Sequence, residues 1–215
     1  MIKKAMLALA YAGAMGAAQA DVLLVENFDD VDSLRAQGWV FENASQPPGL
    51  APGWVQGNLD VFGAQDDENS NAYIASDFNV AGDGGAIDNR LFTPLFSLEQ
   101  GAVASFWLRG AIDPGFSDMV VYGYTEGSTD PLEFIARAET IAPGEWTRYT
   151  FTIDAQAGLG RLGFVHTGSQ ATSNYVGLDT LRIDTLDDPS DVPEPASLFI
   201  LGIGMAGLAA SRRRG

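Results

Sequence analysis

The chain contains no cysteine in its 215 residues, so it cannot form disulfide bridges. Its single histidine, His166, leaves it without the histidine and cysteine ligands of a typical zinc site. Lysine occurs only at Lys3 and Lys4. The stability of the folded protein must therefore come from a hydrophobic core, with a bound metal ion as a further contribution.

Basic residues are also scarce, and they are unevenly placed. Five of the 12 lie at the two ends of the chain, whereas all 28 acidic residues lie between Asp21 and Glu194. That segment has seven arginines and a net charge of −21. Such a surface repels nucleic acid and anionic lipid and favours metal cations. The charge also keeps an extracellular protein soluble, and the two interpretations are compatible.

The first 20 residues have the pattern of a secretory signal peptide. Lys3 and Lys4 precede an apolar, alanine-rich stretch that ends in Ala18-Gln19-Ala20. Small residues at these positions are typical of a cleavage site, so residues 1–20 are predicted to be removed and the mature chain to begin at Asp21. An uncleaved anchor is the alternative, which the weak hydrophobicity of the stretch disfavours.

Residues 192–215 contain three consecutive parts. A proline-rich motif is followed by 15 uncharged residues, 196–210, and then by an arginine cluster. As a helix the uncharged run would span about 22 Å, somewhat less than a hydrocarbon core of ~30 Å. Arginines after such a run stay in the cytoplasm, which places the rest of the chain outside the inner membrane. The residues of the two polar parts are Val192, Pro193, Glu194 and Pro195, and Arg212, Arg213 and Arg214.

This order of parts resembles the PEP-CTERM sorting signal of bacterial proteins, with Pro193-Glu194-Pro195 as the motif. In that family a membrane enzyme, exosortase, recognises and cleaves the tail. The resemblance implies exosortase as a partner, transient anchoring by the helix, and delivery to the cell surface or the exopolysaccharide matrix. An ordinary C-terminal anchor behind a proline-rich linker is the alternative.

Residues 21–185 read as one all-β domain, because short apolar stretches alternate with glycine, asparagine and aspartate. Residues 186–191 form a polar linker. We expect two packed antiparallel sheets, one helical turn at Asp30 to Ala36, irregular stretches at 46–56 and 63–71, and a turn at the glycine-rich residues 80–85. The predicted strands are 22–28, 39–42, 72–76, 90–93, 102–109, 119–125, 132–136, 147–153, 161–166 and 175–183.

Five sequence pieces resemble, in order, the extracellular choice-of-anchor J module and its cleaved-adhesin relatives. The resemblance implies a β jelly roll whose relatives include adhesins and carbohydrate-binding modules, and it implies no catalytic activity. The pieces are Glu26-Asn27-Phe28 with Gly38-Trp39, residues 88–94, Phe106-Trp107, Trp146 with residues 149–153, and residues 175–181.

Two acidic residues lie inside apolar runs, Glu26 near the start of the domain and Asp179 near its end. A buried carboxylate is costly unless it is paired or binds a cation. Because the first and last strands of a jelly roll are commonly neighbours, the two acids are expected to meet. We predict a structural Ca²⁺ at Glu26 and Asp179, joined by Asp29. Pairing of one acid with Arg182 is the alternative.

Other candidate sites give weaker signals. His166 is interpreted as structural, because no serine lies in a Gly-X-Ser-X-Gly context. The acidic loop 66–71 lacks the glycine and terminal glutamate of an EF-hand, which favours a solvated loop. Trp54 and Trp107 are candidates for stacking on sugar rings, although a core role competes at both positions.

The sequence thus predicts a non-enzymatic surface or matrix protein whose β-sandwich serves carbohydrate binding or adhesion. A hydrolase acting on extracellular polysaccharide and a purely structural matrix component remain as alternatives. Nucleic acid is excluded as a partner by the negative charge.

Overall fold

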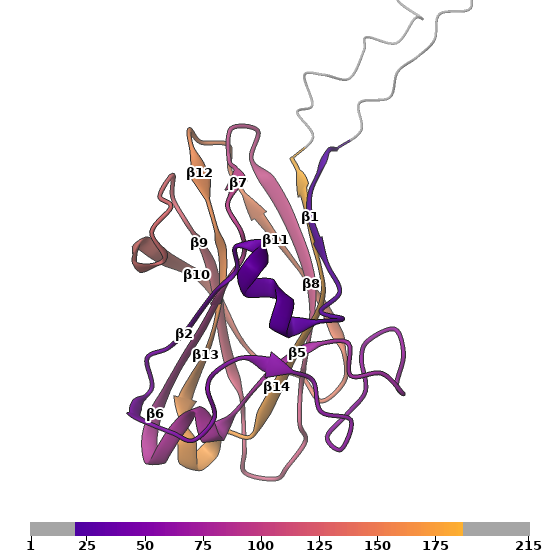
Figure 1. Ribbon diagram of the computed structural model, residues 1–215, viewed down its shortest axis with the longest axis vertical. Coiled ribbons are helices and arrows are strands. Elements are labelled where there is room, and N and C mark those ends of the chain that lie inside the picture. The colour runs from indigo at the N-terminus through magenta and orange to yellow at the C-terminus, as the bar shows by residue number, and fades with distance from the viewer. Residues whose placement is uncertain (1–19, 187–215) are drawn as a thin grey trace, which may run out of the picture. The chain divides into compact units, whose positions relative to one another are not determined.

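Two antiparallel β-sheets face each other across a hydrophobic core in the computed structural model, which describes residues 20–186 (Figure 1). Sheet A has the order β11 (Thr147–Ile153), β8 (Ala102–Gly110), β14 (Tyr175–Thr185), β5 (Ile74–Asp77) and β4 (Val55–Gln56), and β1 (Val22–Glu26) also pairs with β14. Sheet B has the order β10 (Phe134–Ile141), β9 (Met119–Thr125), β13 (Leu162–Ser169), β6 (Ala81–Phe92) and β2 (Val40–Asn43), with β3 (Gln46–Pro48) along β6.

A small third sheet pairs β12 (Leu159–Gly160) with β7 (Phe96–Ser97). Within residues 20–186 the helical segments are four 3-10 turns: η1 (Val31–Gln37), η2 (Phe78–Val80), η3 (Pro131–Glu133) and η4 (Gln170–Thr172). The predicted all-β sandwich of two antiparallel sheets is confirmed, and β9 and β11 have the predicted bounds. Alternation of apolar and polar residues specifies such strands without reference to the rest of the chain.

The glycine-rich residues 80–85 are not a turn, and this prediction was wrong. They enter β6, whose partner there is β3. A Cβ on Gly85 would lie 2.8 Å from the carbonyl oxygen of Gln46, so glycine is needed for the close approach of strands β3 and β6. Likewise, the stretch 46–56, expected to be irregular, contains β3 and β4.

The core lies between the sheets and is rich in aromatic rings. On β8, Phe106 points inward and is fully buried, and its ring meets those of Tyr122 and Phe164 edge to face at 5.2 and 4.9 Å. Its neighbour Trp107 points outward and is half-buried. Period-two alternation thus separates a buried face from a solvated one on this strand.

The helical turn expected at Asp30 to Ala36 is η1, which spans Val31–Gln37 and is capped at both ends. The side chain of Asp30 accepts a hydrogen bond from the Ser33 N–H at 3.3 Å, and Gly38 ends the turn at a φ of +93°. Val31 and Leu34 are buried, which fixes one face of η1 against the sandwich. Figure 1 shows η1 in front of the space between the sheets.

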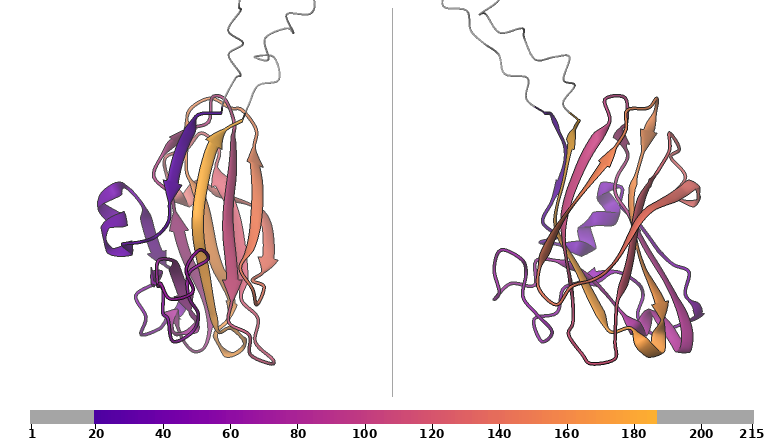
Figure 2. Two further views of the ribbon diagram at one scale, coloured as in Figure 1. Left: turned by 90° about the vertical axis from the view of Figure 1, so that its right-hand side faces the viewer. Right: turned by 180° about the vertical axis from the view of Figure 1, so that it is seen from behind.

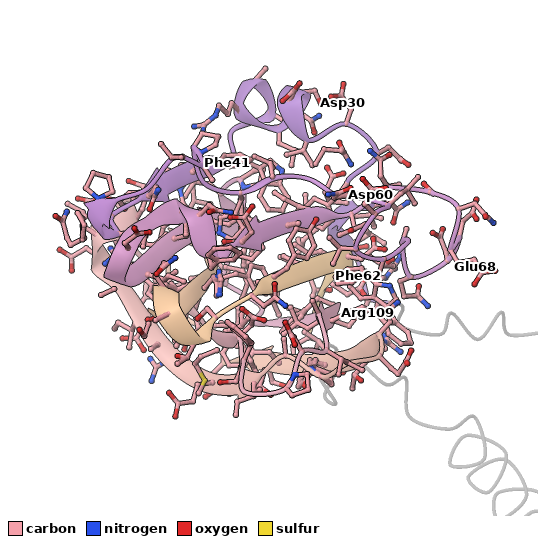
Figure 3. All side chains as sticks on the ribbon, turned by 90° about the horizontal axis from the view of Figure 1, so that it is seen from below. Asp30, Phe41, Asp60, Phe62, Glu68 and Arg109 are labelled. Carbon is pink, nitrogen blue, oxygen red and sulfur yellow. The ribbon has the colours of Figure 1, made fainter. Side chains whose placement is uncertain are left out.

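The long segment 57–72 folds onto the outer face of sheet A and makes a second, smaller core. Phe62 stacks on Tyr73 with ring centroids 5.1 Å apart, and the central carbon of the Arg109 guanidinium lies 4.6 Å from the Phe62 ring centroid (Figure 3). The Trp146 indole N–H donates to the Gly63 carbonyl at 2.9 Å. Gly177 leaves room for these rings, because a Cβ there would lie 2.9 Å from Phe62.

The beginning and the end of the folded region lie side by side. The Asp21 N–H donates to the Thr185 hydroxyl and the Thr185 N–H donates to the Asp21 carbonyl, each at 2.8 Å. Figure 2 shows β1 and the last part of β14 adjacent at the same end of the sandwich. Within residues 20–186 no helix combines the length and the hydrophobicity needed to span a membrane. The predicted membrane helix 196–210 lies outside the described residues, as does the predicted signal peptide except for Ala20.

Candidate functional site

The outer face of sheet B carries a groove of about 340 Å³. It runs across neighbouring strands, because Val165 on β13 lies opposite both Arg90 on β6 and Val121 on β9. The loop that contains η3 forms one rim. The lining residues are Asp88, Arg90, Val121, Leu132, Phe134, Val165 and Thr167.

One side of the groove is polar and held rigidly. The Arg90 guanidinium donates two hydrogen bonds to Asp88, both 2.7 Å long, and Glu42 lies 3.8 Å away on β2. The hydrogen bonding of the Arg90 guanidinium to the Asp88 carboxylate is the main cause that raises the pKa of Arg90 above its ordinary value. Because the two side chains fix each other, the groove presents donor and acceptor atoms in one plane.

The other side of the groove is apolar. Phe134 packs edge to face on the buried Phe92, with ring centroids 5.6 Å apart. Gly163 lies beneath both rings, and a Cβ there would come within 2.9 Å of each. Leu132 on the rim is 71% exposed. An apolar wall that faces a fixed polar pair suits a ligand with one apolar face and a row of hydroxyl groups.

The acids predicted to hold calcium lie on paired strands. β1 and β14 are antiparallel neighbours, with Glu26 opposite Leu181, two residues beyond Asp179. The expected trio with Asp29 does not form a three-carboxylate group, since no three acidic or histidine side chains within residues 20–186 are placed to hold a metal. Asp29 is exposed, because the chain turns at Phe28, which has a φ of +58°.

Asp179 is 1% exposed and lies under the segment 57–72. Its carboxylate accepts hydrogen bonds from the Gln65 N–H at 2.8 Å and from the Thr180 N–H at 2.6 Å. Burial nevertheless raises the pKa of Asp179 to about 6. Burial likewise raises the pKa of Glu26, whose carboxylate accepts from the Phe28 N–H. Arg182, named as an example of an arginine that could pair with one of these acids, pairs instead with Asp184 at 2.7 Å.

A serine, a histidine and an aspartate come together between the sheets, a constellation that the sequence motifs did not reveal. The Ser76 hydroxyl lies 2.8 Å from His166 Nδ1, and His166 Nε2 lies 3.2 Å from Asp118. Their exposed fractions are 0, 0 and 2%. Because no substrate can reach a hydroxyl group buried in this way, the set is structural, as predicted for His166.

The two candidate tryptophans occupy different environments. Trp54 is buried in the main core, and its indole N–H donates to the Asn89 carbonyl at 3.1 Å. Of the two roles considered for Trp54, packing in the core and stacking on a sugar ring, this environment corresponds to the first. Trp107 is half-buried on the outer face of sheet A, opposite Arg148 on β11 and Asp179 on β14. The groove residues of sheet B were not singled out as a site from the sequence, because strands far apart in the chain supply them.

A family model for the PEP-CTERM protein-sorting motif matches residues 191–214. The chain carries a PEP-CTERM sorting motif. This match confirms the identification made from the proline-rich motif, the uncharged run and the arginines. A search of curated protein sequences finds no match to the chain.

The fold resembles those of cleaved adhesin domains of Lys-gingipain from Porphyromonas gingivalis W83. The K1 domain is 24% identical over 76% of this chain and 98% of its own, with a TM-score of 0.59. The K3 domain is 20% identical over 77% and 99%, with a TM-score of 0.56. The K2 domain of Lys-gingipain is 18% identical over 76% and 99%, with a TM-score of 0.53. At these identities the likeness concerns the fold alone, and it confirms the predicted similarity to cleaved adhesin domains.

Proposed function

We propose that the protein is an exported, non-enzymatic component of the cell surface or exopolysaccharide matrix, whose jelly-roll sandwich binds neutral polysaccharide in the sheet B groove. The PEP-CTERM motif supports export and sorting by an exosortase, with transient anchoring by residues 196–210 and a cytoplasmic C-terminus. The adhesin-like fold supports a role in binding rather than in catalysis.

The observation that carries the binding proposal is the composition of the groove. Its volume of about 340 Å³ lies in the range of small-ligand sites, and its walls combine apolar side chains with few polar groups. A sugar ring has an apolar face of C–H groups and an equatorial edge of hydroxyl groups. In the proposed complex Phe134 and Leu132 contact the face, while Asp88 and Arg90 exchange hydrogen bonds with the edge. The net charge of −21 between residues 21 and 194 favours a neutral chain over an acidic one.

A glycan array with the full-length protein in mild detergent tests this assignment. Neutral oligosaccharides should bind, and Arg90→Ala should weaken that binding at least tenfold. Arg137→Ala, which removes an arginine paired with Glu126 elsewhere on sheet B, is the matched control and should bind as the wild type does. Absence of binding to all neutral glycans, or release of reducing ends from them, would contradict the proposed function.

The proposal includes a structural Ca²⁺ held by Glu26 and Asp179. Asp179 is a buried carboxylate whose described contacts include no cationic side chain, and a divalent cation would offset the cost of its charge. Main-chain carbonyl oxygens and water would complete the shell, and the exposed Asp29 could take part through water.

Thermal unfolding with Ca²⁺ and with EDTA tests the calcium site. Calcium should raise the midpoint temperature of thermal unfolding of the wild type. The midpoint temperature of the Glu26→Gln, Asp179→Asn double variant should not change on addition of calcium. Asp67→Asn in the acidic loop should respond to calcium as the wild type does. Equal midpoints of the wild type with and without calcium would exclude the site.

Processing by an exosortase is tested by mass spectrometry of the C-terminal peptide in protein recovered from the native host. The proposal expects peptides that lack the arginine cluster. Recovery of an intact tail after Pro195 in all molecules would instead identify a permanent membrane anchor.

A further inference from the structure

A second cavity, of about 420 Å³, lies on another part of the molecule, between η1 and the strands beside it. It does not share a residue with the groove on sheet B. Most of its lining is apolar, and its two charged side chains both come from η1. The lining residues are Val31, Asp32, Arg35, Phe41, Pro52, Trp54 and Val55.

The guanidinium of Arg35 is held in place without using its hydrogen-bond donors. It lies over the ring of Phe41 with its central carbon 4.3 Å from the ring centroid, and Figure 3 shows Phe41 on the strand next to η1. The guanidinium makes no hydrogen bond or ion pair with any other residue that the structure describes. Arg35 is solvent-exposed, and its five N–H donors are therefore open to a ligand beside the cavity.

Asp32 lies three residues before Arg35, a spacing at which opposite charges on a helical turn usually pair. Here neither side chain has an ion-pair partner among the described residues. The cavity therefore offers a set of donors and a carboxylate acceptor next to each other, each without a competing partner in the protein.

The walls of the cavity restrict what can fill it. Phe41, whose ring lies under the Arg35 guanidinium, and Pro52 are apolar lining residues, and the buried Trp54 is anchored by its hydrogen bond to the Asn89 carbonyl. Trp54 thus supports this cavity from the core rather than acting as an exposed stacking platform. Val31 and Val55 complete the apolar lining.

Three classes of ligand can be compared by charge. A carboxylate would be attracted by Arg35 but repelled by Asp32 and by a net charge of −21 over residues 21–194. A cation would be repelled by the positively charged guanidinium of Arg35. A neutral ligand with adjacent hydroxyl groups can accept hydrogen bonds from Arg35 and donate to Asp32 at the same time, while its apolar face contacts the apolar lining at Pro52 and Val55.

We infer that this cavity is a second glycan site, which takes one or two neutral sugar units. The inference rests on the proposed glycan binding and extends it: one domain holds two polysaccharide segments at separate sites. Two separate sites allow one protein to hold two polysaccharide chains together. Where a single chain occupies both sites, the first contact raises the effective concentration of the second segment and tightens binding.

Isothermal titration of the full-length protein in mild detergent tests the inference. The probes are neutral pentasaccharides of glucose, galactose, mannose and xylose, with pentagalacturonate as the acidic comparison. The wild type should bind the preferred neutral probe at two sites. Arg35→Met keeps an apolar side chain on Phe41 but removes the donors, and it should leave one site. Arg90→Ala should leave the other site, and Arg182→Met, a matched loss of an exposed arginine, should keep both.

The outcomes separate this inference from the proposed function. One site in the wild type that Arg90→Ala weakens and Arg35→Met does not would overturn the second site and leave the groove standing. If Arg35→Met loses all binding while Arg90→Ala binds as the wild type does, the site in the cavity is supported and the site in the sheet B groove is overturned. Tighter binding of pentagalacturonate than of every neutral probe would overturn the neutral ligand class. Absence of binding to all probes would overturn both proposals.

Discussion

The Ser76 hydroxyl on β5 lies 2.8 Å from Nδ1 of His166 on β13, and this contact joins the two sheets through the buried interior. The Asn89 amide donates to the same hydroxyl at 2.7 Å. On the other side of the imidazole ring, His166 Nε2 lies 3.2 Å from Asp118 Oδ1. Asn89 Oδ1 is buried and has no hydrogen-bond partner among the described residues, so the network is satisfied in part. Its remaining bonds offset part of the cost of burying these polar groups.

Ser76→Ala should destabilise the protein by about 2–3 kcal/mol, because it leaves His166 Nδ1 and an Asn89 N–H buried without a partner. Ser117→Ala, at an exposed serine of the loop before β9, is the control and should have little effect. Urea unfolding with an unchanged m-value measures the difference. Equal midpoints for the two variants would show that the network contributes no net stability.

The metal-free protein should lose stability as the pH rises through 6, because of Asp179. Its folded-state pKa of about 6 lies above the ordinary value of 3.8, so the folded state keeps the proton longer than the unfolded state. The contribution of protonated Asp179 to the free energy of unfolding is fully present below the unfolded-state pKa of the group. It is lost as the pH rises through the folded-state pKa, and the loss amounts to roughly 3 kcal/mol at neutral pH. In EDTA, thermal unfolding of Asp179→Asn should show a flatter pH dependence than the wild type. Parallel curves for the two proteins would contradict this role of Asp179.

Adjacent residues on β8 should differ sharply in their contribution to stability. Phe106→Ala removes a fully buried ring and should cost about 3–5 kcal/mol. Trp107→Ala changes a half-buried side chain on the outer face and should cost about 1 kcal/mol. Denaturant unfolding of the two variants provides an internal comparison. A larger loss for Trp107→Ala would mean that the inward and outward faces of β8 are misassigned.

Trp146→Phe should loosen the segment 57–72, because it removes the hydrogen bond to the Gly63 carbonyl while keeping an aromatic ring. The expected cost is about 1 kcal/mol. Cleavage after Glu68 by a glutamate-specific protease should become faster than in the wild type. Trp107→Phe is the matched control, since the indole of Trp107 makes no hydrogen bond to a described residue. Equal cleavage rates for both variants would show that this bond does not hold the segment.

Short-range patterns in the sequence predicted the features that depend on neighbouring residues. The alternation in 147–153 and the apolar run 119–125 gave two strands with their correct bounds. Asp30 and Gly38 gave the bounds of the helical turn, and the PEP-CTERM motif was recognised from its own residues. In each case the chemistry that decides the feature lies within a few residues along the chain.

The tertiary structure decided everything that depends on long-range register. Ser76 and His166 are 90 residues apart in sequence, and their meeting follows from the packing of β5 against β13. The glycine-rich start of β6 became part of a strand because β3 pairs with Ala81 and Ala86 on either side of the glycines, and the groove of sheet B joins Arg90 to Phe134 across four strands. Composition alone could indicate a sandwich, whereas the positions of buried carboxylates and open grooves depend on which strands become neighbours. Strand order is a property of the packed core, and no local stretch of this sequence contains it.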